Sequence, residues 1–180
     1  MTGPTSHTTE VTIRMLATLG EDEIAQLADV LIDCVDGGAS VSFMHPLSQE
    51  KAMTFWRDLA TDVASGRRRL LAAYDAQGMV GTVQVVAAQP DNQPHRADIA
   101  KMLVHRRARR RGIGAALMRA AEDAAREAGK TLLVLDTVSG GDAERLYSRL
   151  GWVFSGTVPD YALWPHGGLC ATSFYYRRLA

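Results

Sequence analysis

A basic, glycine-containing turn is the part of this sequence best suited to bind an anion. Residues 109–114 read Arg-Arg-Arg-Gly-Ile-Gly, between a predicted strand over 97–104 and a predicted helix over 112–128. The start of a helix presents unpaired backbone N–H groups and a positive dipole end, and glycine lets a phosphate approach closely. Arginines add charge-assisted hydrogen bonds, although the turn lacks the Lys-Ser/Thr end of a P-loop and the third glycine of a dinucleotide fingerprint. The turn predicts a pyrophosphate site, with a basic surface cap or a nucleic-acid patch as alternatives.

Two aspartates are predicted to lie in one cleft beside this turn. Asp136 follows the apolar strand 132–135, and Asp98 lies near the start of the neighbouring strand. Ligands of such sheets usually lie beyond the carboxyl ends of the parallel strands, which directs Asp136 into the cleft. Either carboxylate can bind a substrate ammonium or take its proton through a water. A solvated acid at a strand end is the alternative for both, and a helix or turn cap is a further one for Asp136.

The hydrophobic pattern predicts the elements that position these groups. The unit made of strand 97–104, helix 112–128 and strand 131–135 predicts a right-handed crossover, so these two strands are parallel neighbours in an otherwise antiparallel sheet. The remaining predicted elements are a strand over 11–16, helices over 21–33 and 48–65, a hairpin over 70–74 and 79–88, a short helix over 142–150, and strands over 152–157 and 171–178.

Length and composition place the chain among ordinary globular proteins. Its 180 residues, 47% of them hydrophobic, predict one domain over 11–180 after a flexible tail over 1–10. Twenty Lys+Arg balance twenty Asp+Glu, which excludes a protein held to nucleic acid or membrane by its overall charge. We expect a reduced cytoplasmic protein without signal peptide, membrane span or metal, because it has two cysteines, no long apolar run and five histidines without ligand spacing. The net charge of zero conceals five arginines within 106–111, which predict a local positive site.

Two motifs resemble those of the GNAT N-acetyltransferases. Residues 104–114 resemble the family's acetyl-CoA motif, Arg/Gln-x-x-Gly-x-Gly/Ala, with Arg109, Gly112 and Gly114 at its defined positions. Arg106 stands where the family often has proline, and Arg110 where it often has glycine. Residues 143–152 resemble the family's Ala-x-x-Leu/Phe-Tyr-x-x-Leu-Gly-Phe/Trp helix and following strand. The resemblance implies an α+β fold with a mixed, mostly antiparallel sheet of about seven strands, a splayed parallel pair, and helices on both faces.

The same resemblance implies an acetyl-CoA-dependent N-acetyltransferase in which the amine attacks directly in a ternary complex. Tyr147 then protonates the departing thiolate, although a core aromatic residue is the alternative. Asp98 and Asp136 bind the substrate and relay its proton, and a backbone N–H near 102–104 stabilises the oxyanion. The implied acetyl-CoA-binding residues are Met102, Leu103, Val104, Arg109, Arg110, Arg111, Gly112, Ile113, Gly114, Ala143 and Tyr147.

Residues 37–44, 96–104 and 135–137 resemble the tabtoxin-resistance type of these enzymes, which acetylate a small amino-acid-like antibiotic. The resemblance implies a small amine acceptor, in a pocket lined by Ser40, Phe43, Asp98 and Asp136 and partly covered by a predicted loop over 158–171. Acetylation of a protein N-terminus or lysine is the enzymatic alternative, and a non-catalytic module that binds CoA or nucleic acid is the third. We expect a monomer or homodimer with no nucleic-acid or membrane partner.

Overall fold

A seven-stranded sheet forms the centre of the molecule. The computed structural model describes residues 10–179, so the expected tail lies outside the described residues except for Glu10. Neighbouring strands are antiparallel except for β4 and β5, which confirms the mixed α+β fold. In order across the sheet, the strands are β1 (Thr12–Leu16), β2 (Arg68–Asp75), β3 (Gly78–Ala87), β4 (Arg96–Val104), β5 (Leu132–Val138), β7 (Leu169–Arg178) and β6 (Val153–Leu163).

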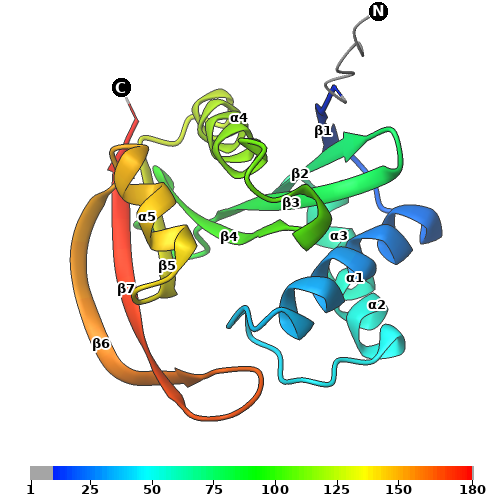
Figure 1. Cartoon of the computed structure of the whole chain (residues 1–180). Helices are drawn as coiled ribbons and strands as arrows, with labels where there is room; N and C mark the ends of the chain where they lie inside the picture. Colours follow the sequence, from blue (N-terminus) through cyan, green and yellow to red (C-terminus); the bar gives the residue numbers. More distant parts are fainter. Residues whose placement is uncertain (1–9, 180) are drawn as a thin grey trace, which may run out of the picture.

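Helices cover both faces of this sheet (Figure 1). On one face lie α1 (Glu21–Asp36), α2 (Gln49–Asp58) and α3 (Ala60–Ala64), and on the other α4 (Ile113–Glu127) and α5 (Asp142–Arg149); the 3₁₀ turn η1 (Arg106–Ala108) precedes α4. Each face has its own core: Leu27, Leu31 and Trp56 are fully buried on the first, and Leu117, Met118 and Leu133 on the second. The predicted helices on both faces are confirmed.

Two predicted helix boundaries differ in the structure. Helix α1 continues to Asp36, one turn beyond the predicted end, and stops at Gly37. The predicted helix over 48–65 begins as expected, with the Ser48 hydroxyl accepting a 3.2 Å hydrogen bond from the Lys51 N–H, but it is interrupted at Leu59. The Leu59 N–H bonds to the carbonyl of Trp56, three residues back, and this tighter turn separates α2 from α3. Apolar residues keep their helical spacing across the break, so the pattern does not show it.

The predicted loop over 158–171 is wrong, because β6 and β7 form a long hairpin with a turn over 164–168 (Figure 1). Their pairing continues from Val158 opposite Thr172 to Leu163 opposite Leu169. The register shifts between Val158 and Ala162, where Pro159 interrupts the alternation. Proline is tolerated there because β6 is an edge strand and the register is irregular. This interruption explains why the sequence pattern indicated a loop.

The parallel pair separates soon after it forms. Strands β4 and β5 pair only over 96–98 with 132–134, although β4 continues to Val104 and β5 to Val138. Strand β4 also contains a bulge, because Ala100 pairs with Gln84 while Leu103 pairs with Thr82. Lys101, in this bulge, has a φ of 46°. The end of the β4–β5 pairing leaves the edge of β4 beyond Asp98 without a β5 partner, and the chain continues from there to the start of α4.

Candidate active site

The first turn of α4 forms an open backbone cradle at the predicted anion site. Gly112 precedes the helix with a φ of 76°, and a Cβ atom placed on it would meet nothing within 4 Å. Gly114 has a different reason, since its Cβ would approach the Leu146 side chain to 3.1 Å and the Met102 sulfur to 3.7 Å. The first N–H groups of the helix have no intrahelical acceptor. One glycine therefore leaves room for a ligand, and the other lets α4 pack against α5 and β4.

The arginines around this cradle contact carboxylates and a carbonyl of the protein itself, which the sequence did not indicate. Arg106 Nε lies 2.9 Å from Oδ1 of Asp33, and Arg109 Nε donates a 3.1 Å hydrogen bond to the Val104 carbonyl. Arg107 and Arg111 both contact Asp75. Arg110, whose φ is 60°, interacts electrostatically with Asp142 at the start of α5. Three of the five guanidinium groups thus form ion pairs, which reduces the predicted local positive charge.

Tyr147 lies on α5 with its ring in the core on the α4 side of the sheet. Only 5% of the residue is exposed, and its ring centroid lies 6.1 Å from that of Trp152 and 6.3 Å from that of Tyr175. Burial raises the pKa of the Tyr147 phenol, and the charge of Asp136 raises it further. The hydroxyl has no hydrogen-bond partner among residues 10–179. Tyr147 therefore keeps its proton at neutral pH and has it available to donate.

Asp98 and Asp136 occupy neighbouring strands on the face opposite α4. Their neighbours Ile99 and Leu135 belong to the α4 core, so the alternation of a strand directs both carboxylates to the other side. Asp98 pairs with Val134 in register, and Asp136 follows two residues later, within β5 and exposed. The prediction that Asp136 ends its strand is wrong, because β5 runs on to Val138. Asp98 accepts a 2.5 Å hydrogen bond from Arg96, whereas Asp136 forms no ion pair among the described residues.

Lys101 is a charged group of the site that the sequence did not indicate. Its ammonium donates a 3.1 Å hydrogen bond to the Ser42 hydroxyl and lies 5.6 Å from the centre of the Phe55 ring. Burial lowers the pKa of the Lys101 ammonium, an effect that Asp136 opposes and Arg68 reinforces. In the sequence this lysine is a polar residue within a predicted strand. Only the bulge directs it toward Ser42, and a bulge has no reliable residue signature.

The two predicted acceptor residues, Ser40 and Phe43, lie in the loop between α1 and α2. Ser40 donates a 3.0 Å hydrogen bond to the Leu163 carbonyl at the end of β6, so its hydroxyl joins this loop to the hairpin. Phe43 packs edge-on against Phe55, with ring centroids 5.2 Å apart. The His45 N–H donates to the Pro165 carbonyl as a second link. Phe43 therefore packs against the same Phe55 ring that Lys101 approaches. Ser40 instead joins the loop to the end of β6.

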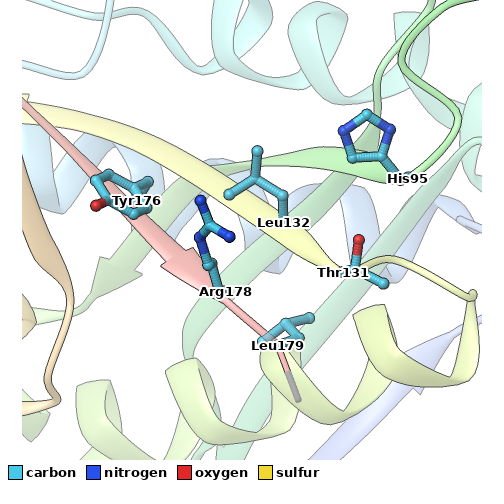
Figure 2. A pocket seen from close by; sticks show the side chains of 6 residues that line it. All are labelled: His95, Thr131, Leu132, Tyr176, Arg178 and Leu179. Carbon is cyan, nitrogen blue, oxygen red and sulfur yellow. The ribbon is translucent and has the colours of Figure 1, made fainter.

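A pocket of about 530 Å³ lies away from these residues. Figure 2 shows that His95, Thr131 and Leu132 line one side of it, at the amino ends of β4 and β5. Tyr176, Arg178 and Leu179 line the other side (Figure 2). The α4 cradle adjoins the opposite, carboxyl end of β4. None of the predicted site residues lines this pocket, so the pocket lies outside the candidate active site.

Other reactive groups in the described part of the chain offer little chemistry. Cys34 and Cys170 are free and buried. Burial raises the pKa of the Cys34 thiol, so this cysteine stays protonated and is a poor nucleophile. Between residues 10 and 179, no cluster of three or more His, Cys, Asp or Glu side chains could hold a metal ion. Within that range no helix has the length and apolar character to cross a membrane.

Comparison with known proteins identifies a family and a fold. The model of the acetyltransferase (GNAT) family matches residues 38–152, which is more than half of the chain. One similar structure is yncA, a candidate acetyltransferase from Salmonella typhimurium solved with its cofactor acetyl-CoA, at 18% identity, a TM-score of 0.76 and 94% coverage of both chains.

Two further solved structures share the fold. Ribosomal-protein-alanine N-acetyltransferase from Brucella melitensis is 20% identical, with a TM-score of 0.77 over 93% of this chain and 99% of that one. A candidate phosphinothricin N-acetyltransferase is 16% identical, with a TM-score of 0.76 over 95% and 99%. At these identities, the similarity establishes a common architecture and leaves the acceptor open.

Proposed function

The chain belongs to the acetyltransferase (GNAT) family, and from this premise we propose that it transfers the acetyl group of acetyl-CoA to the primary amine of a small molecule. The observation that carries the proposal is the gap between β4 and β5, which begins beyond Asp98 and adjoins the cradle of α4. Asp136 lies on one strand of this gap and interacts electrostatically with Tyr147. We further propose that this activity resides in one domain over 11–180 and acts in the cytoplasm.

The residues around the gap fit acetyl-CoA. The free N–H groups at the start of α4 suit a pyrophosphate, and Gly112 leaves open space above them. The edge of β4 beyond Asp98 lacks a β5 partner, so it can pair with the amide groups of an extended arm. Acetyl-CoA supplies the activated acetyl thioester. The residues proposed to hold it are Met102, Leu103, Val104, Arg109, Arg110, Arg111, Gly112, Ile113, Gly114, Ala143 and Tyr147.

Direct attack by the amine explains the polar groups near the gap. An alkylammonium has a pKa near 10, so it must lose a proton before it can attack. We assign to Asp136, two residues beyond the register partner of Asp98, the role of binding the ammonium and taking its proton through a water. The amine nitrogen bonds to the acetyl carbon, backbone N–H groups at the β4 bulge stabilise the oxyanion, and the carbon–sulfur bond breaks. Tyr147 then donates its proton to the departing thiolate, and the remaining excess proton of the nitrogen passes through water to restore the phenol.

The proposed acceptor is an amino-acid-like or antibiotic amine. Two observations support this choice: the resemblance to the tabtoxin-resistance type, and the shared fold with a candidate phosphinothricin N-acetyltransferase. Ser40 and His45 also link the 37–48 loop to the β6–β7 hairpin, so these two segments lie side by side near the proposed acceptor residues. Acetylation of a protein N-terminus is the second candidate, supported by the shared fold with ribosomal-protein-alanine N-acetyltransferase.

A thiol-release assay tests the proposed function. The protein is mixed with acetyl-CoA and a panel of amino acids, aminoglycosides, polyamines and peptides, and free CoA is measured over time. We expect release above the enzyme-free rate with one class of small amine, and acetylated product by mass spectrometry. Release with peptides alone would replace the proposal by the second candidate. Absence of release with every member would contradict acetyl transfer to amines.

A further inference from the structure

Three polar side chains with unsatisfied donors lie close together on the acceptor face. The Gln84 side chain is fully buried and accepts a hydrogen bond from Arg68 through Oε1, while its Nε2 has no partner within the described chain. The Arg68 Nε is also buried without a partner there. Lys101 is the third member, with a single hydrogen bond, to Ser42, for three donor hydrogens. Buried donors are rarely left unmatched in native proteins, so this group calls for an acceptor.

Strand pairing brings the three residues together. Gln84 on β3 stands opposite Ala100 on β4, and the bulge residue Lys101 comes next along the chain. Arg68 lies on β2, with Gln84 as its side-chain partner, and its charge reaches Lys101. Neither Lys101 nor Arg68 forms an ion pair within residues 10–179. Two like charges thus share a partly buried site without a carboxylate at contact distance.

This face carries positive charge on one side of the β4–β5 gap and a negative charge on the other. Arg68, Gln84 and Lys101 supply donors and positive charge, while Asp136, which forms no ion pair within residues 10–179, supplies a carboxylate that interacts with Lys101 across the gap. A partly buried cation gains most from an anion that desolvates with it and accepts its hydrogen bonds. An acceptor with an ammonium at one end and an acid at the other matches both halves of the face.

We propose that Arg68, Gln84 and Lys101 bind an acidic group of the acceptor, a carboxylate or a phosphinate, and so restrict acetylation to amines that carry an acid. This inference rests on the proposed acetyl transfer and assigns the residues that select its acceptor. Lys101 is then a specificity-determining residue, held in place by Ser42 and the Phe55 ring. Polyamines and aminoglycosides, which carry amines without an acid, are poor acceptors.

Lys101→Met tests the inference, because it removes the charge and keeps most of the side-chain length. Steady-state rates are measured with α-amino acids, the amides of the same amino acids, and amino acids that carry a phosphinate. We expect KM for the acids to rise roughly tenfold or more with a smaller change in kcat, as for loss of a charge-assisted hydrogen bond. The amides should respond little, and Lys101→Arg should recover part of the loss. Lys51→Met, at an exposed position on α2, is the matched control.

Two outcomes overturn the inference while acetyl transfer stands. One is a wild-type enzyme that acetylates amides, polyamines or aminoglycosides as efficiently as the acids. The other is a Lys101→Met variant whose KM changes by the same factor for an acid and its amide. If no amine releases CoA, the proposed function fails. Calorimetric titration of the amino acids into the CoA-saturated protein then tests separately whether Arg68, Gln84 and Lys101 bind an acidic group. Amino-acid binding that weakens in Lys101→Met and not in Lys51→Met supports the proposed acid-binding role. Equal affinity in the two variants overturns it.

Discussion

Nη1 of Arg107 lies 2.8 Å from Oδ2 of Asp75, which joins the segment before α4 to the end of β2. Arg111 contacts the same carboxylate oxygen at 3.2 Å, and the Asp75 side chain is only 4% exposed. Burial alone would raise the pKa of the Asp75 carboxyl, but hydrogen bonds from Arg107, the Gln77 N–H and Arg111 lower it overall. This carboxylate therefore fixes two arginines close to the start of α4 and is ionised at neutral pH.

Asp75→Asn should lower the free energy of unfolding by about 1–3 kcal/mol at pH 7, because two arginines lose a buried partner. A carboxyl group whose pKa is lowered on folding stabilises the folded protein at pH values above its ordinary pKa of 3.8. This stabilisation is lost as the pH falls through the lowered pKa. The difference from wild type should therefore shrink on acidification. Urea denaturation from pH 7 to the lowest pH at which both proteins fold measures it. Asp91→Asn, in an exposed loop, is the control, and a pH-independent difference would contradict the prediction.

Gly112→Asp should abolish the rise in thermal midpoint that CoA produces in the wild type, because a carboxylate at the cradle repels phosphate. Gly129→Asp is a matched control at the other end of α4. Both glycines have positive φ, 76° and 70°, and neither would bring a Cβ within 4 Å of another group. The backbone strain is therefore similar. Differential scanning fluorimetry with and without CoA compares them, and equal shifts in the two variants would exclude the cradle.

Tyr147→Phe should lower kcat by about 10²–10³-fold if the phenol is the general acid, with little change in KM for acetyl-CoA. The phenol pKa is raised, so its proton is retained well above neutral pH and the wild type should show no alkaline decline from this group up to pH 9. Steady-state kinetics across pH 6–9 measure both effects. Phenylalanine preserves the packing against Trp152 and Tyr175, so unchanged kcat would leave Tyr147 as a packing residue.

Asp136→Asn should reduce kcat/KM for the amine by roughly ten- to a hundredfold, the range of a lost charge-assisted contact. Asp98→Asn should reduce it less, because Arg96 already neutralises that carboxylate. The two substitutions change charge equally on adjacent strands, so each is the control for the other. Saturation curves for the amine at fixed acetyl-CoA separate KM from kcat. A larger loss in Asp98→Asn would reverse the assigned roles.

The elements were predictable where one residue type repeated at a regular spacing. Apolar alternation located the β2–β3 hairpin and the strand β4, and glycines marked the ends of the helices. The β6–β7 hairpin was missed because an edge strand has no buried face to enforce alternation, and Pro159 interrupts the pattern.

Within the site, the backbone part was predictable and the charge pairing was not. The two glycines of the α4 cradle, Gly112 and Gly114, lie only two positions apart in sequence. The acidic partners of the arginines lie far away in sequence, since Asp33 belongs to α1 and Asp75 is the last residue of β2. Lys101 was missed for a similar reason: its position depends on a register shift between two strands and on Ser42, which lies 59 residues away. Such pairings follow from topology rather than from local pattern.

The hydrogen bond from Ser40 to Leu163 joins residues 123 positions apart. Closing so long a segment costs chain entropy, and contacts of this kind form late in folding. A chain emerging from the ribosome can complete β4, the cradle and α4 before the β6–β7 hairpin exists. The part of the chain proposed to bind acetyl-CoA can therefore fold early during synthesis. The link between the 37–48 loop and the end of β6 can form only after β6 has been synthesised.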